Sequence, residues 1–121
     1  MSDVPLAQIR SELVEGVAII DFLPHELTEP SEAERLGAAL RSVAEANISD
    51  RLLLNMKATR YVSSTAFAVL YSFALRTRAA GTRVAICDMD PQVRFGANII
   101  QLGAVVPMYD DEATALAALI A

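Results

Sequence analysis

The segment that decides the fold is residues 52–103, with the sequence LLLNMKATRYVSSTAFAVLYSFALRTRAAGTRVAICDMDPQVRFGANIIQLG. A short apolar run within Arg51–Met56 fits a strand that is buried on both faces. A helical pattern follows over Thr65–Ala80 and stops at Gly81, a residue type that commonly terminates helices. The next run, Arg83–Cys87, is again short and apolar. A strand, a helix and a second strand in this order predict a parallel pair joined by a right-handed crossover.

The segment before this core predicts a hairpin and a helix. Two apolar runs, Gln8–Val14 and Val17–Phe22, are separated by the turn signal Glu15-Gly16 and predict a β-hairpin. An amphipathic helix is expected to follow, with Ser31 as its N-cap and Asn47 at its end.

The segment after the core continues the alternation of helices and strands. We expect a helix over Pro91–Leu102, a strand over Val105–Met108 and a helix over Asp111–Ile120. The sequence therefore predicts a single α/β domain over residues 1–121, with a mixed, mainly parallel sheet, an N-terminal hairpin and about four flanking helices. Of the 21 alanines, five are expected where helices face the sheet: Ala39, Ala66, Ala74, Ala115 and Ala118.

The composition excludes several classes of function. The net charge is −5 and the chain has a single lysine, so the basic stripe of a nucleic-acid binder is missing. One His and one Cys leave no internal disulfide and argue against a Cys/His zinc site, so no metal or cofactor is expected. No apolar run approaches the roughly 20 residues that span a bilayer, and the N-terminal residues lack signal-peptide character. We therefore expect a cytoplasmic protein that does not bind a membrane.

Two adjacent serines, Ser63 and Ser64, form the most informative candidate site. They lie between a predicted buried strand and a predicted helix, and ligand sites of open α/β sheets gather where strands end. Free N–H groups and the dipole at a helix start stabilise an added phosphate. The alternative interpretation is that one serine merely caps the helix. Both interpretations can hold, one for each hydroxyl.

Asp88 and Asp90 offer a weaker, enzymatic alternative. Two acids after a buried strand resemble the nucleophile and acid of haloacid-dehalogenase-type phosphatases. The context argues against this role, because that nucleophile strand normally comes early in the chain and Pro91 follows the second acid directly. We expect these residues to be loop and N-cap acids of the next helix.

Over residues 52–103 the sequence resembles the core of the STAS domain, the family of bacterial anti-sigma factor antagonists. That family has an Asp-Ser-Ser-Gly motif, a helix ending near Ala-Gly-Gly, a strand ending in Cys and a Pro-x-Val helix start. The corresponding segments here are Val62-Ser63-Ser64-Thr65, Ala80-Gly81-Thr82, Cys87 and Pro91-Gln92-Val93. The N-terminal hairpin and the segment from Tyr109 also fit, so the resemblance covers nearly the whole chain.

The resemblance implies a regulator without catalytic activity of its own. Antagonists of this kind bind an ATP-dependent serine kinase that also acts as an anti-sigma factor. The kinase phosphorylates the first serine of the pair, phosphorylation releases the antagonist, and a PP2C-type phosphatase restores it. By position the acceptor is Ser63, with Ser64 as helix cap or neighbour and Thr65 as a competing hydroxyl.

Two departures from the family pattern flank the expected acceptor. Val62 replaces the family Asp, and Thr65 replaces the Gly. We expect the partner to bind Val62, Ser63, Ser64 and Thr65 and the face of the following helix, with Arg76 and Arg78 on or near that face. A second hypothesis, which Val62 favours, is a non-phosphorylated scaffold that assembles with other STAS domains or with itself.

Overall fold

A computed structural model describes residues 8–121 and has the α/β architecture that the sequence predicts. A five-stranded sheet has the order β1-β2-β4-β6-β7. Its strands are β1 (Ile9–Val14), β2 (Val17–Phe22), β4 (Arg51–Asn55), β6 (Arg83–Cys87) and β7 (Met108–Tyr109). Only the β1–β2 hairpin is antiparallel, and the other pairs are parallel. The mixed, mainly parallel sheet with an N-terminal hairpin is therefore confirmed.

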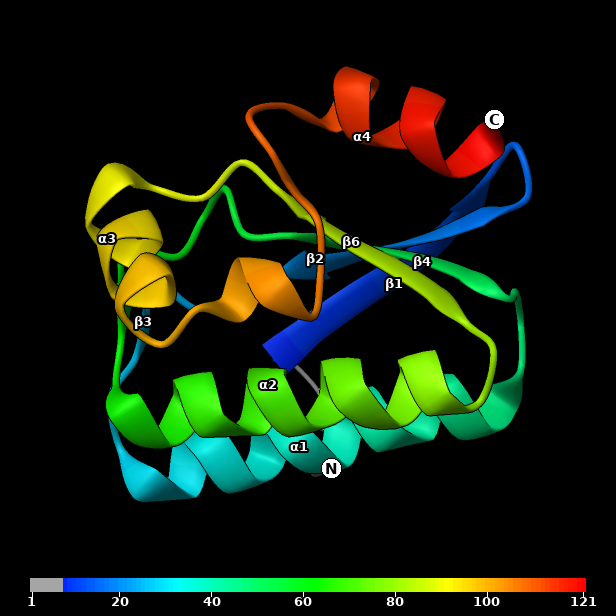
Figure 1. The fold of residues 1–121 in the computed structure, drawn as a ribbon. Helices are drawn as coiled ribbons and strands as arrows, with labels where there is room; N and C mark the ends of the chain where they lie inside the picture. Colours follow the sequence, from blue (N-terminus) through cyan, green and yellow to red (C-terminus); the bar gives the residue numbers. More distant parts are fainter. Residues whose placement is uncertain (1–7) are drawn as a thin grey trace.

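Within residues 8–121, four α-helices flank this sheet. They are α1 (Pro30–Ala46), α2 (Ser64–Ala79), α3 (Pro91–Ile99) and α4 (Glu112–Ile120). Helices α1 and α2 lie side by side on one face of the sheet, α4 covers the other face, and α3 lies beside the sheet (Figure 1). A 3₁₀ turn, Leu102–Ala104, follows α3.

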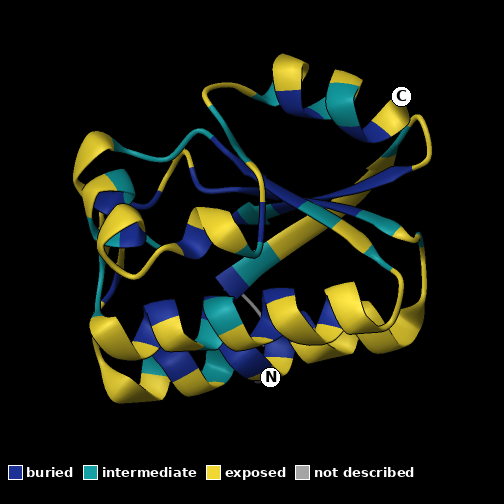
Figure 2. Cartoon of the chain, viewed as in Figure 1, coloured by how far each residue is buried: buried dark blue, intermediate teal, exposed yellow. Residues whose placement is uncertain are grey.

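The apolar core is divided by the sheet into two parts. The larger part lies between the sheet and the helices α1, α2 and α3, and it is built on residues such as Ile20, Leu54 and Leu70. The smaller part lies under α4 and includes Cys87 and Leu119. Four of the five alanines expected to face the sheet are buried, and Ala118 is half-buried. Figure 2 shows the buried central strands between largely exposed outer helix surfaces.

A second, two-stranded sheet was not expected from the sequence. It pairs β3 (Glu26–Leu27) in parallel with β5 (Tyr61–Val62). Neither strand exceeds two residues, which is too short to produce a periodic pattern in the sequence. The pair is nevertheless important, because β5 leads directly into α2.

The start of α1 differs from the expectation. The helix begins at Pro30 with Glu29 as N-cap, so the prediction of Ser31 as the cap is wrong. The carboxylate of Glu32 accepts a hydrogen bond from the main-chain N–H of Glu29 at 2.8 Å, which satisfies that N–H without a serine. The expected end at Asn47 is confirmed, and this residue has the left-handed conformation with φ 53°.

Two elements near the C-terminus are shifted from their expected positions. Helix α3 ends at Ile99 rather than at Leu102, because Gln101 adopts a left-handed conformation with φ 58°. Strand β7 begins after Pro107 rather than at Val105. Proline has no N–H to donate to a strand ladder, and Pro107 contacts β6 only through its carbonyl, which accepts from the N–H of Ile86 at 2.9 Å.

Candidate functional site

The candidate site is the segment Val62–Thr65, where β5 ends and α2 begins. Parallel pairing places Val62 opposite Leu27, and the N–H of Ser63 donates to the carbonyl of Leu27 at 2.9 Å. On the other side, the carbonyl of Ser63 accepts from the N–H of Phe67 at 2.9 Å. The main chain of Ser63 is thus held by a strand on one side and a helix on the other.

Ser63 is the N-cap of α2. Its Oγ accepts a hydrogen bond from the N–H of Ala66 at 3.1 Å. Of the two alternatives for Ser64, helix cap or neighbour, the structure agrees with the neighbour, since Ser64 is already the first helical residue. A capping hydroxyl uses only one lone pair, so the Ser63 Oγ keeps its proton and a second lone pair.

The three hydroxyls differ in exposure. Ser63 is half-buried, whereas Ser64 and Thr65 are exposed on the first turn of α2. That turn contains no acidic residue. The partial positive charge of a 16-residue helix is therefore not offset by a carboxylate within the turn, and this environment suits an added phosphate.

An apolar surface borders the segment. A hollow beside the start of α2 has Val62, Tyr61 and Phe95 among its lining residues. The side chains of Tyr61 and Phe95 are 48% and 69% exposed, and Ile99, one turn further along α3, is 67% exposed. No recognisable motif in the sequence marks these residues. One signal in the sequence could have indicated this surface. Phe95 and Ile99 are four residues apart and therefore lie on one face of a helix, which differs from the face of the buried Val93 and Ala97.

Arg76 and Arg78 do not lie beside Ser63. They belong to the last turn of α2, and a rise of 1.5 Å per residue places them about 20 Å from its start. Arg76 borders a groove between α1 and α2 that Arg41 also lines. Arg78 borders a separate hollow next to β6. The structure therefore brings Val62, Ser63, Ser64 and Thr65 together. Arg76 lines the same groove as Thr65, whereas Arg78 lies on another surface.

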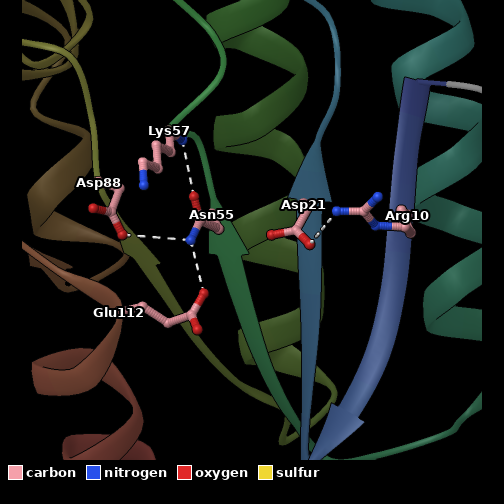
Figure 3. Close-up of polar contacts among 6 residues, drawn as sticks. All are labelled: Arg10, Asp21, Asn55, Lys57, Asp88 and Glu112. Carbon is pink, nitrogen blue, oxygen red and sulfur yellow. Dashed lines mark hydrogen bonds and ion pairs between the residues drawn. The ribbon is translucent and has the colours of Figure 1, made fainter.

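A second polar cluster lies at the carboxyl ends of β2, β4 and β6, and is drawn in Figure 3. The Asn55 side-chain amide donates to Glu112 at 2.8 Å and to Asp88 at 3.4 Å, and its oxygen accepts from the N–H of Lys57 at 2.9 Å. Asp21 lies two strands away from Asp88 and pairs with Arg10 at 3.5 Å. This cluster ties α4 to the ends of the central strands.

The two acids considered for a phosphatase have separate roles in the structure. Asp88 accepts from Asn55, whereas Asp90 caps α3 by accepting from the N–H of Gln92 at 3.0 Å. Burial raises the pKa of the neighbouring Cys87 thiol, and the nearby carboxylate of Asp88 adds to this rise. Within residues 8–121, no group of three or more His, Cys, Asp or Glu side chains could hold a metal ion. No helix in the same range is long and apolar enough to cross a membrane.

Several solved structures share this architecture. A crystal structure of a putative anti-sigma factor antagonist from Thermotoga maritima is similar, with a TM-score of 0.81, 14% identity and coverage of 95% of this chain and 97% of that chain. An anti-sigma factor antagonist from Mycobacterium paratuberculosis gives a TM-score of 0.77, 19% identity and coverage of 92% of each chain. The Bacillus cell fate determinant SpoIIAA in its phosphorylated form gives a TM-score of 0.67 and 15% identity, with coverage of 91% of this chain and 97% of that chain.

The sequence alone also identifies a family. No curated protein sequence matches this chain. The family model of the STAS domain, however, matches residues 9–115, from the first residue of β1 into α4. The order of strands and helices, the serine pair at the start of α2 and this match agree, and the chain belongs to the STAS domain family.

Proposed function

We propose that this STAS domain is a partner-switching regulator, an anti-sigma factor antagonist that is controlled by reversible phosphorylation of Ser63. Its partners would be an anti-sigma factor with serine kinase activity and a PP2C-type phosphatase. The cycle consumes ATP and is proposed to take place in the cytoplasm. In this proposal the domain is a substrate and binding partner, not an enzyme.

The observation that carries the proposal is the position of Ser63 as N-cap of α2. A phosphate on this residue would carry a charge of about −1.5 to −2 and would face the free N–H groups of the first helical turn. The helix dipole stabilises that charge, so the modified chain keeps its fold. The same charge beside the exposed Tyr61 and Phe95 would be unfavourable in an apolar interface. Phosphorylation could therefore release a partner without unfolding the domain.

The partner surface is proposed to comprise the Val62–Thr65 segment and the adjoining apolar residues of β5 and α3. Tyr61, Phe95 and Ile99 supply large exposed side chains, and aromatic residues of this kind are enriched at the centres of protein interfaces. Arg76 is a peripheral contact in this arrangement, at the far end of the same helix. Arg78 would contact only a partner that reaches around α2.

A second candidate function is favoured by Val62. The family Asp before the serine pair is absent, which removes a charge that a kinase could recognise. A non-phosphorylated scaffold that assembles with other STAS domains needs no such charge. An Asp88/Asp90 phosphatase has less support, because Asp90 is engaged in capping α3.

The test is phosphorylation by the anti-sigma factor serine kinases of the organism that encodes the chain, with radiolabelled ATP and mapping of the site by mass spectrometry. We expect label on Ser63, loss of label in Ser63→Ala, and unchanged label in the matched control Ser64→Ala. Label on Ser64 or Thr65 would overturn the assignment of the acceptor. A kinase that binds the chain tightly but transfers no phosphate would favour the scaffold instead.

A further inference from the structure

Among residues 8–121, no strand pairs with the outer edge of β1. The sheet ends at β1 on one side and at β7 on the other. Strand β7 has only two residues and follows Pro107, and short strands and prolines are common ways of protecting an edge. Strand β1 has six residues and contains no proline. Within residues 8–121, β1 is the only long free edge of this sheet.

The hairpin register determines which main-chain groups face outward from this edge. Val14 and Val17 flank a two-residue turn and therefore form a hydrogen-bonded pair. Hydrogen-bonded pairs then recur at every second residue, in agreement with the bond from the N–H of Leu23 to the carbonyl of Gln8 at 3.0 Å. The N–H and C=O groups of the intervening residues, Ile9, Ser11 and Leu13, point away from β2.

The side chains of β1 are arranged symmetrically around Ser11. Arg10 precedes it and Glu12 follows it, and both point to the same face of the sheet as Asp21 and Ile19, their partners on β2. Ile9 and Leu13 flank them on the opposite face. All the residues from Arg10 to Leu13 are exposed, and Leu13 is 58% exposed, which is large for an apolar side chain in a strand. Figure 2 shows this strand as mostly exposed.

We propose that β1 pairs antiparallel with β1 of a second copy of this chain, around a two-fold axis at Ser11, to form a homodimer with a continuous sheet. In this register Ser11 lies opposite Ser11 of the second copy, and Ile9 lies opposite Leu13. These are the residues whose main-chain groups point outward, so each pair exchanges both of its hydrogen bonds. The exposed Leu13 gains an apolar neighbour.

The charges of Arg10 and Glu12 favour this register over the two adjacent registers, which have their two-fold axes at Arg10 and at Glu12. Around Ser11, Arg10 lies opposite Glu12 of the second copy in a non-hydrogen-bonded pair, where opposed side chains are closest. A two-fold axis at Glu12 would oppose two glutamates, and one at Arg10 would oppose two arginines. Like charges directly opposite each other are destabilising. The self-complementary sequence of β1 thus identifies a second copy as the occupant, and the proposal depends on neither Ser63 nor its phosphorylation.

The first test measures the average molar mass in solution by sedimentation equilibrium, at increasing protein concentrations. The highest concentration is about 1 mM, so that a weak dimer is also detected. The mass of the wild-type chain should rise from 13.0 kDa towards twice that value. Ser11→Pro removes an N–H that does not bond to β2, so the variant should fold normally and remain at 13.0 kDa. Glu12→Arg, which opposes two arginines, should also remain monomeric. A wild-type mass that stays at the monomer value would overturn the proposal and identify Arg10 and Glu12 as charges that protect the edge.

A cross-linking experiment tests the register itself. Opposed residues of a hydrogen-bonded pair lie about 5.5 Å apart between Cα atoms, within the range of a disulfide. Oxidation of Ser11→Cys should therefore give a covalent dimer in high yield. The matched control is Leu13→Cys, whose two copies would lie roughly 14 Å apart along the strands and should not cross-link. Equal cross-linking of both variants, or a dimer that persists in folded Ser11→Pro and Glu12→Arg, would contradict pairing through β1.

Discussion

At the level of single residues, the proposed phosphorylation switch depends on Ser63 as the cap of α2. The Oγ of this side chain satisfies one of the free N–H groups at the helix start, that of Ala66. A phosphoryl group on this oxygen would remain within reach of the same N–H groups. Ser64 carries the same hydroxyl one position later and makes no cap.

The cap predicts a difference in stability between two serine variants. Ser63→Ala should lower the free energy of unfolding by about 1 kcal/mol, the usual effect of losing an N-cap. Ser64→Ala should leave it unchanged within about 0.5 kcal/mol, since this side chain is exposed and alanine is a good helix former. Urea titration followed by circular dichroism measures both values. Equal losses in the two variants would show that Ser63 does not cap the helix.

Gly96 is a second position where one residue controls the packing of an element. A Cβ added at this position would lie 2.8 Å from the ring of Phe67, so glycine allows α3 to pack closely on α2. Gly96→Ala should destabilise the domain by about 1–3 kcal/mol, the usual cost of overpacking. Gly37→Ala in α1 is the matched control, because a Cβ there meets only ordinary contacts at 3.5 Å. Gly37→Ala should raise the free energy of unfolding by roughly 0.5–1 kcal/mol. A neutral Gly96→Ala in the same urea titrations would contradict the close packing.

At the element scale, the central strands and their helices were predictable, whereas the short β3–β5 pair was not. Each of β2, β4 and β6 contains an apolar run that identifies a buried strand. Two-residue strands carry no such pattern, and their pairing depends on contacts between segments far apart in the sequence. The serine pair was found from its place between a strand and a helix. The surface formed by Tyr61 and Phe95 was missed, because it exists only once β5 and α3 lie together.

The polar cluster at the strand ends predicts an effect of charge. Asn55→Asp keeps the acceptor for the N–H of Lys57 but places a third carboxylate against Glu112 and Asp88. The side-chain donor is lost, and like charges repel in a partly buried site. We expect Asn55→Asp to lower the free energy of unfolding by about 1–3 kcal/mol at pH 7. The exposed Gln92→Glu makes the same change of amide to carboxylate outside this cluster, on the first turn of α3, where the helix dipole offsets an added charge beside Asp90, and it should be nearly neutral. A similar loss in both variants would contradict the role of Asn55.

The start of α4 predicts a dependence of stability on pH. Hydrogen bonds from the main-chain N–H and the hydroxyl of Thr114 lower the pKa of Asp111 below its usual value. A group whose pKa is depressed in the folded state contributes stability above its unfolded pKa and loses it as the pH falls through the folded pKa. Asp111→Ala should therefore be less stable than the wild type at pH 7, and the difference should shrink below about pH 4. A difference that is constant from pH 7 to pH 2 would show that the charged carboxylate is not what stabilises α4.

At the scale of the whole molecule, the proposed phosphate acceptor and the edge strand β1 are separate features. Ser63 lies at the start of α2, next to the two-stranded sheet, whereas β1 forms the end of the main sheet. A dimer through β1 does not use Ser63, Tyr61 or Phe95. We therefore expect Ser11→Pro to abolish the proposed self-association without affecting the proposed partner switching, and Ser63→Ala to have the opposite effect.

The most direct test of the central claim is the affinity of the anti-sigma factor kinase for the chain with and without phosphate on Ser63. Calorimetric titration should give tight binding for the unmodified chain and binding weakened at least about 100-fold, or roughly 2.7 kcal/mol, for the phosphorylated chain. Ser63→Asp, which retains a capping oxygen, should fold like the wild type and also bind weakly. Equal affinities for the phosphorylated and unmodified chains would contradict the account.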